Sequence, residues 1–353
     1  MTIYQDSKRF VGTAEDRAGY PAGVDGVGGW KELGRTTFGG GAKEYSVPSL
    51  DNKRYYMILV NNFQSAQTEG DSWKVNSTVG NEYSGRESKN GDVYNGTMIN
   101  KAKVAFWGFH PHSQPSFAVG WTSNLATKEK LGISYAIGQT ANVSGAGNAP
   151  DRGECVQKWA NTSVSINEFM QKNAWNNYNS GSEMVVLGWD PADTHTTNFW
   201  EELYSDSGTS LDSGVGGITA KKYLWIQTYL DLSSSSANHS FQFNGDTGSN
   251  YAVRYNLNGA GEATDANRTD ALVPYQGQPS TNMAFCNTFI INNSANEKLC
   301  INHVVWGNTA GAGTAPNRQE HVAKWANTSA QITDIAVGGT YGANSQMKVW
   351  GSD

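Results

Sequence analysis

Aromatic and amide side chains in one asparagine-rich segment are the first candidates for chemistry in this sequence. Trp175 and Tyr178 lie in the stretch 173–179, where they do not follow the spacing of a periodic core, and Asn176 and Asn177 lie between them. Aromatic rings stack on the apolar faces of sugars, while amides hydrogen-bond sugar hydroxyls. The segment therefore predicts a glycan-binding loop. The alternative is a loop packed against a neighbouring subunit.

Two other segments carry residue types that bind metals. His110-Pro111-His112 is the only close histidine pair, but zinc sites need three or four ligands and no cysteine or other histidine lies nearby in sequence. The stretch 244–250 has oxygen-bearing side chains like those of calcium loops, but it has one carboxylate and no closing glutamate. We expect an ordinary loop at the first segment and a hairpin turn at the second, with no metal and no other cofactor.

Two cysteines could react with each other. Cys286 and Cys300 are symmetric about residue 293, so a hairpin that turns there would place them opposite each other on two strands. Cross-strand disulfides are often strained. We favour two packed thiols over a disulfide bond, and the disulfide bond is the alternative.

The strongest pattern in the chain is an internal repeat. The segment 53–58 recurs as 221–226, an offset of 168, and the six residues 158–163 recur unchanged as 324–329. The repeated unit has about 160 residues, whereas solenoid repeats have about 20–50. We infer a duplicated domain. The predicted division is an N-terminal arm at 1–29, a first domain at 30–190 and a second domain at 191–353.

The segments that must position these residues have the composition and alternation that are typical of β-strands. The run 55–60 is rich in aromatic and β-branched residues. Apolar residues alternate over 241–243 and again over 251–255, on either side of a turn, which predicts a hairpin. The segments 285–291 and 299–305 predict a second hairpin.

Helical patterns are scarce. At most, residues 154–159 and 320–325 could form one helical turn each. A domain of about 160 residues with many short antiparallel strands and glycine turns is typical of a β-sandwich. The predicted fold class is all-β, with two tandem duplicated sandwiches of jelly-roll type behind an N-terminal arm. A partly open barrel is the alternative.

Composition excludes several classes of protein. The chain has 353 residues, of which 16% are charged, with a formal net charge of -6 and 40 aromatic residues among Trp, Tyr and Phe (12, 16 and 12). So many aromatic residues argue against disorder, and the mildly acidic balance argues against nucleic-acid binding. No apolar stretch is long enough to span a bilayer, and residues 1–29 hold no apolar run of a secretory leader.

Catalysis finds no positive support in the sequence. No carboxylate pair and no Ser/His/Asp series is preserved in both copies of the repeat. A glycan-degrading enzyme needs two carboxylates about 5–10 Å apart across a cleft. We therefore expect that the protein is not an enzyme.

A repeated tripeptide matches the N-glycosylation signal. It occurs at Asn161-Thr162-Ser163 and again at Asn327-Thr328-Ser329. Because the two copies are identical, we interpret them as turns held by their own side chains.

Several of these segments resemble one family of proteins. The stretches 53–57, 243–251, 311–318 and 324–329, and the opening 3–9, are similar to repeat-built structural proteins of marine tailed viruses and related environmental viruses. The resemblance implies a virion surface component: a fibre, a decoration protein or a capsid-associated protein. It implies no catalytic residues.

These observations together lead to an expected function with two alternatives. The expectation is a virion structural protein that assembles with copies of itself and other virion proteins into the capsid surface or a fibre. It would be located in the virion, with host-surface glycans as a further contact. The alternatives are a carbohydrate-binding adhesin and a glycan-degrading enzyme on a jelly roll. Neither nucleic acid nor a membrane span is expected.

Overall fold

The protein is built from β-strands. The computed structural model describes residues 3–5, 8–11, 29–63, 71–91, 96–101, 104–105, 115–139, 143–173, 176–190, 198–232, 239–272, 282–307 and 311–353. Within these ranges every regular element is a strand, and the strands pair antiparallel in five separate sheets. The prediction of an all-β sandwich fold is confirmed. Among the same residues, no helix has the length and apolar character to cross a membrane.

The first half of the chain forms one large and one small sheet. In spatial order the large sheet consists of β3 (Lys31–Thr37), β14 (Glu183–Trp189), β5 (Tyr55–Asn62), β10 (Ser116–Ser123), β11 (Lys130–Gly138), β12 (Asp151–Trp159), β7 (Tyr83–Lys89) and β8 (Gly96–Lys101). The small sheet consists of β4 (Glu44–Val47), β13 (Phe169–Lys172), β6 (Ser72–Val75) and β9 (Val104–Ala105).

The second half repeats this arrangement. Its large sheet consists of β15 (Glu201–Ser207), β25 (Gln346–Ser352), β16 (Tyr223–Leu232), β21 (Asn282–Ile291), β22 (Lys298–Trp306), β23 (Asn317–Trp325), β18 (Tyr251–Leu257) and β19 (Ala263–Arg268). Its small sheet consists of β20 (Ala271–Leu272), β17 (Ser240–Phe243) and β24 (Ile335–Gly338). A bridge between Asp212 and Ala336 occupies the place that β4 has in the first half. The strand order is therefore the same in both large sheets.

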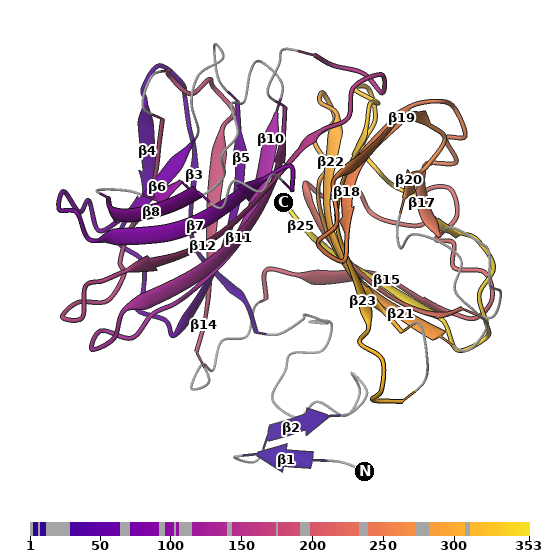
Figure 1. Ribbon diagram of the computed structural model, residues 1–353, viewed down its shortest axis with the longest axis horizontal. Coiled ribbons are helices and arrows are strands. Elements are labelled where there is room, and N and C mark those ends of the chain that lie inside the picture. Colours follow the sequence, from indigo (N-terminus) through magenta and orange to yellow (C-terminus); the bar gives the residue numbers. More distant parts are fainter. Residues whose placement is uncertain are drawn as a thin grey trace.

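A separate two-stranded sheet lies near the N-terminus. It pairs β1 (Ile3–Gln5) with β2 (Lys8–Val11), within the segment expected to form an arm (Figure 1). The rest of that segment, except Gly29, lies outside the described residues.

The repeat is preserved down to single hydrogen bonds. The Tyr83 hydroxyl accepts from the backbone N–H of Val75, and the Tyr251 hydroxyl accepts from that of Phe243, at 3.0 Å in both cases. The buried Lys130 and Lys298 each donate to a backbone carbonyl, that of Asn161 (2.7 Å) or Asn327 (2.8 Å). These bonds explain why the same residue types recur in both halves.

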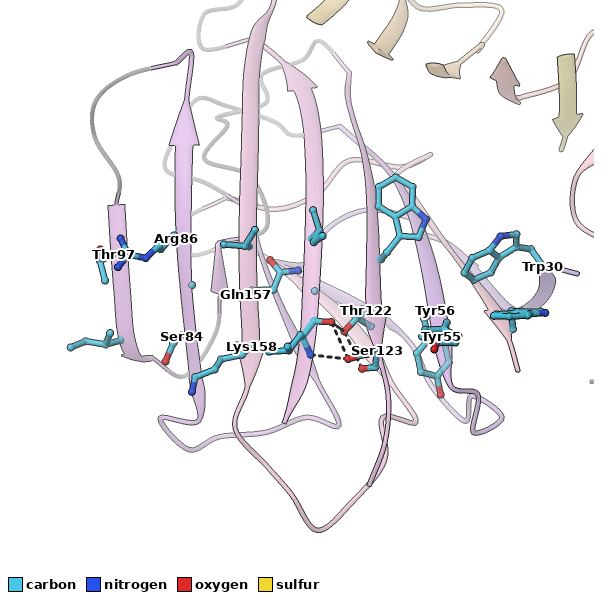
Figure 2. Close-up of a pocket in the computed structure, with 18 residues that line it drawn as sticks. Trp30, Tyr55, Tyr56, Ser84, Arg86, Thr97, Thr122, Ser123, Gln157 and Lys158 are labelled. Atoms are coloured by element: carbon cyan, nitrogen blue, oxygen red, sulfur yellow. Dashed lines mark hydrogen bonds between the residues drawn. The ribbon is translucent and has the colours of Figure 1, made fainter. Parts of the chain in front are cut away.

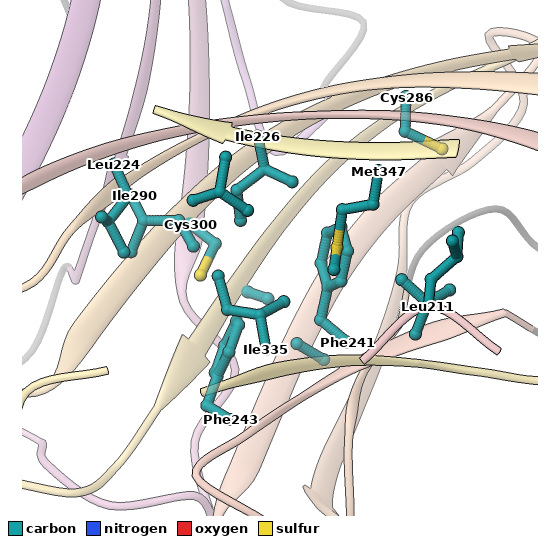
Figure 3. Close-up of a cluster of buried hydrophobic side chains, with 14 of the residues drawn as sticks. Leu211, Leu224, Ile226, Phe241, Phe243, Cys286, Ile290, Cys300, Ile335 and Met347 are labelled. Atoms are coloured by element: carbon teal, nitrogen blue, oxygen red, sulfur yellow. The ribbon is translucent and has the colours of Figure 1, made fainter. Parts of the chain in front are cut away.

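Each sandwich has its own apolar core between its large and small sheets. The cores contain the equivalent tryptophans Trp159 and Trp325, both fully buried. Figure 3 shows the core of the second sandwich, where side chains from β16, β17, β21, β24 and β25 meet. The indole N–H groups are satisfied differently, because Trp159 donates to Glu82 (2.8 Å) and Trp325 donates to Asp246 (2.7 Å).

A third apolar cluster joins the two sandwiches. It lies between the outer faces of the two large sheets and contains Leu59 and Val119 from the first half and Phe289 and Ile301 from the second. The molecule therefore has four β-layers, with the small sheets outermost and the large sheets against each other (Figure 1). Because both faces of the large sheets are covered here, the strands need no alternation of apolar and polar residues.

Two local predictions are wrong. The segments 241–243 and 251–255 do not form a hairpin, because β17 belongs to the small sheet and β18 to the large one. The turn between them carries the chain from one layer of the sandwich to the other. The segments 154–159 and 320–325 are strand rather than helical turn. The second predicted hairpin, β21 with β22, is confirmed.

Candidate functional site

An open groove lies on the outer face of the first large sheet. The third apolar cluster covers only one end of this face, and the other end is exposed. The exposed end forms a groove of about 900 Å³ (Figure 2). Its centre is a row of neighbouring side chains on five adjacent strands: Trp121, Ile133, Val156, Arg86 and Thr97.

The floor of the groove is aliphatic. Leu131 is 57% exposed and Val156 is 50% exposed, and Ile133 and Ile99 are exposed beside them. Leu131, Ile133 and Val156 lie on the adjacent strands β11 and β12, and Ile99 lies on β8, with β7 between β12 and β8. An exposed apolar patch of this kind marks an interaction site.

Aromatic rings gather at one end of the groove. Tyr55 stacks on Trp189 with ring centroids 5.4 Å apart, and Trp30 and Trp121 line the same groove. Trp121 also packs edge-on against Phe289 of the second sandwich at 5.6 Å. The aromatic end therefore adjoins the place where the two large sheets meet.

The polar groups that line the groove include hydroxyls and two cationic side chains. Arg86 is exposed, and the Lys158 ammonium is 3.1 Å from Glu129. The Ser123 hydroxyl accepts from the Leu131 N–H at 3.1 Å. Among the described residues that line the groove, none carries a carboxylate, an imidazole or a thiol. The groove therefore offers an apolar surface with a cationic edge formed by Arg86 and Lys158.

Of the predicted glycan-binding residues, the described ones (Asn176, Asn177 and Tyr178) do not line this groove. Tyr178 is fully buried, its hydroxyl donates to Asp71 at 2.9 Å, and its ring packs edge-on against Tyr45 at 5.1 Å. The expected exposure of Tyr178 is therefore wrong, because these distant partners bring it into the core. Asn177 is exposed and Asn176 is half-buried. Trp175 lies outside the described residues.

Of the two segments with metal-binding residue types, the structure describes only one. His110 and His112 lie outside the described residues, and within the described ones no group of three or more metal-binding side chains occurs. Asp246 accepts hydrogen bonds from Gly248, Asn250 and Trp325. Its carboxylate therefore holds the turn and the buried indole.

Cys286 and Cys300 are not joined by a disulfide bond. Cys286 and Cys300 are buried in the core of the second sandwich and lie at different places in it (Figure 3). They are not opposite each other, because the register pairs Cys286 with Val304 and Cys300 with Ile290. The preference for packed thiols is confirmed, and the expected cross-strand position is wrong. Burial raises the pKa of Cys286 to about 12.

The glycosylation-like tripeptides form the expected turns. Asn161 Oδ1 accepts from the backbone N–H of Ser163 (2.9 Å) and of Val164 (3.1 Å), and Asn327 Oδ1 accepts from the equivalent groups. Their repetition thus follows from turn geometry.

Comparison with known proteins adds little. No protein-family model matches this sequence, and no curated protein matches it. Among solved structures, the crystal structure of the LG1-3 region of the laminin alpha2 chain is similar at 7% identity with a TM-score of 0.19. The match covers 88% of this chain and 64% of the laminin chain. A likeness this weak supports neither a function nor a partner.

The groove was not singled out from the sequence, although a signal is present. In β11 the bulky residues Leu131, Ile133, Tyr135 and Ile137 alternate with small or polar ones. Such alternation is normally interpreted as bulky side chains facing the sandwich core. Here they face outward, and the small residues between them face the core.

Proposed function

We propose that this protein is a structural subunit that assembles through the open end of its first large sheet. The observation that carries the proposal is the exposed aliphatic floor formed by Leu131, Ile133 and Val156. Exposing such a surface to water is unfavourable, and burying it against another protein removes that cost.

The finer proposal is a virion component. The resemblance of the repeated segments to structural proteins of marine tailed viruses supports this assignment, as does the duplication, which presents two similar sandwiches for assembly. On this proposal the protein is not an enzyme, its partners are copies of itself and other virion proteins, and its location is the particle surface.

The first experiment measures self-association. The mass of the purified chain is followed by sedimentation velocity across a wide range of concentrations, for the natural protein and for Ile133→Asp. We expect the natural protein to form species larger than one chain, and we expect Ile133→Asp to stay monomeric because a buried, unpaired carboxylate is strongly unfavourable. Val79→Asp, at a fully exposed site away from the groove, is the matched control and keeps the natural behaviour. A natural protein that is monomeric throughout overturns the proposal.

Glycan binding is a second candidate, favoured by one observation. Several aromatic residues line the end of the groove, among them the stacked pair Tyr55 and Trp189. Trp175, Asn176 and Asn177 remain a separate predicted contact. A glycan array with the natural protein, Tyr55→Ala and Trp175→Ala tests both sites. Loss of binding in one variant assigns the site, and the absence of any glycan signal across a broad panel contradicts this candidate.

A further inference from the structure

The connection between β11 and β12 of the first sandwich reaches the second sandwich. The backbone N–H of Gly145 donates to the Glu297 carboxylate, and the Ala146 carbonyl accepts from the N–H of Asn267 at 2.8 Å. Just beyond this connection, Arg152 donates to Glu262 at 3.0 Å. These contacts hold the connection against the second sandwich.

An open cavity of about 340 Å³ lies between this connection and the second sandwich. Gln139, Asn148 and Asp151 line it from the first sandwich, and Arg254 and Thr264 line it from the second. Ligand sites in proteins have volumes of about 300–1,000 Å³ and occur preferentially where two domains meet. The cavity therefore has the size and the place of a small-molecule site.

The second sandwich contributes a cation and a hydroxyl. Arg254 on β18 and Thr264 on β19 lie opposite each other in the register of these strands. Arg254 Nε donates to the Pro150 carbonyl at 2.7 Å, which fixes the guanidinium at the cavity. Within the described part of the chain its terminal nitrogens donate no hydrogen bond, and a carboxylate oxygen of Asp151 lies 3.7 Å from one of them. These nitrogens are left as donors for a bound molecule.

The first sandwich contributes two buried acceptors. Gln139 follows β11 and is 3% exposed, and Asp151 begins β12 and is 5% exposed. Asp151 accepts from the Asn90 side chain at 2.6 Å. Gln139 Oε1 is buried, and among the described residues no donor reaches it. Buried acceptors without a donor are rare in native proteins, and a hydroxyl group bound in the cavity would supply one.

The groups around the cavity are suited to hydroxyl groups. The guanidinium of Arg254 only donates hydrogen bonds, and the carboxylate of Asp151 only accepts them. Thr264 and Asn148 do both. Because each sugar hydroxyl also does both, a ring with several hydroxyls can satisfy all four side chains. An anion would meet the carboxylate of Asp151, and an apolar molecule would leave the polar groups unpaired.

The repeat supplies a comparison for this cavity. In the second sandwich the equivalent connection, 311–316, is exposed along its whole length. By the register of the two hairpins, Gly307 stands in the place of Gln139 and Asn317 in the place of Asp151. The second connection therefore lacks the buried amide and the carboxylate, and its exposure shows that no described residue forms an opposing wall.

We propose that the cavity between the β11–β12 connection and the second sandwich binds a neutral sugar ring. This inference goes beyond assembly through the groove, because no residue of the cavity lines the groove. It also differs from the glycan contacts at Tyr55 and Trp175. Since the walls come from both sandwiches, a bound sugar would also hold the two sandwiches together.

The test measures the binding of neutral monosaccharides by titration calorimetry. Glucose, galactose, mannose and N-acetylglucosamine are the probes. Thr264→Val and Asn148→Leu each remove a polar group at an exposed position of the cavity. Each is expected to weaken binding about fivefold, the effect of one lost hydrogen bond. Thr314→Leu, at the position equivalent to Asn148 in the exposed connection, is the matched control and keeps the natural affinity.

The outcomes distinguish this inference from the proposed function. If the natural protein binds none of the four sugars, the inference is overturned, while assembly through the groove is unaffected. Binding that is lost in Tyr55→Ala and kept in Thr264→Val places the sugar in the groove and also overturns it. Equal weakening in Asn148→Leu and Thr314→Leu contradicts it as well. Circular dichroism checks folding, and Ala266→Trp, which fills the cavity and should abolish binding, replaces any variant that does not fold.

Discussion

The outer faces of the two large sheets are nearly the same in sequence pattern and opposite in exposure. Ile133 and Ile301 occupy equivalent places, but the first is exposed and the second is buried against the other sheet. Phe117 and Phe285 also occupy equivalent places, but here the residue of the first sheet is buried and that of the second is exposed. This difference shows that duplication alone does not give the two sandwiches equivalent surfaces. The two large sheets pack against each other with an offset, so a different end of each sheet is covered.

The largest expected effect separates Ile301 from Ile133. Ile301→Ala removes buried methyl groups at the interface of the sheets, and we expect a loss of about 2–5 kcal/mol in the free energy of unfolding. Ile133→Ala at the exposed equivalent changes it by about 0.5 kcal/mol or less in the monomer. Denaturant unfolding at low protein concentration measures both. Equal losses would contradict the difference in burial.

The next effect concerns Glu183, which joins the sandwiches. Burial opposes its ionisation, but hydrogen bonds from Lys222, Thr37 and Tyr223 outweigh burial and hold its pKa below the ordinary value of 4.5. A lowered pKa means that this contribution is present above pH 4.5 and is lost as the pH falls through the lower folded value. We expect Glu183→Gln to cost about 2 kcal/mol near neutral pH, since partners of a buried carboxylate lose a charged acceptor.

The pH profile of unfolding checks this. The difference in stability between the natural protein and Glu183→Gln should shrink as the pH falls below 4.5. Gln346→Ala, at the exposed equivalent position, serves as the control with a change of about 0.5 kcal/mol or less. A difference that stays constant with pH would contradict a role for the carboxylate charge.

A smaller effect is expected from His303, whose ring lies 3.9 Å from that of Tyr135 between the sheets. Burial, with a smaller contribution from Arg152, lowers the pKa of His303 to about 4. Because the unfolded chain binds a proton near pH 6.5 and the folded chain does not, stability falls as the pH drops from 6.5 towards 4. We expect the free energy of unfolding of His303→Gln to fall less than that of the natural protein over this pH range, by about 1 kcal/mol. Thermal unfolding at a series of pH values measures it.

The neighbours of His303 must be considered in that measurement. Glu154 and Glu320 lie in the same region, and burial raises the pKa of Glu154 above its ordinary value. Protonation of Glu154 therefore stabilises the fold as the pH falls, which opposes the histidine. Burial also lowers the pKa of His239, so His239→Gln measures how much a second histidine contributes to the decline. A decline that is unchanged in His303→Gln would assign it to other groups.

The fold could be predicted from the sequence because the repeat and the strand composition agree. Matching segments at 53–58 and 221–226 mark equivalent strands, and the hairpin of β21 and β22 follows from local turn chemistry. The connection from Phe243 to Tyr251 could not be assigned in this way. A turn of that length joins strands in one sheet or in two facing sheets, and the alternation of apolar residues is the same in both cases.

The site could not be predicted, for a different reason. Tyr178 is buried by Tyr45 and Asp71, which lie more than a hundred residues earlier in the chain, and no local pattern contains that contact. The groove depends on which end of a sheet the other sandwich covers. Ile133 and Ile301 have similar neighbours in sequence, so their different exposure arises only when the whole chain is assembled.

The exposure of unlike ends has a consequence for recognition of this chain. The first large sheet presents the aliphatic side chains Leu131, Ile133 and Val156, whereas the second presents Tyr229, Phe285 and Val305. A partner shaped to fit one of these surfaces does not fit the other, so a duplicated unit offers two different binding specificities in one chain.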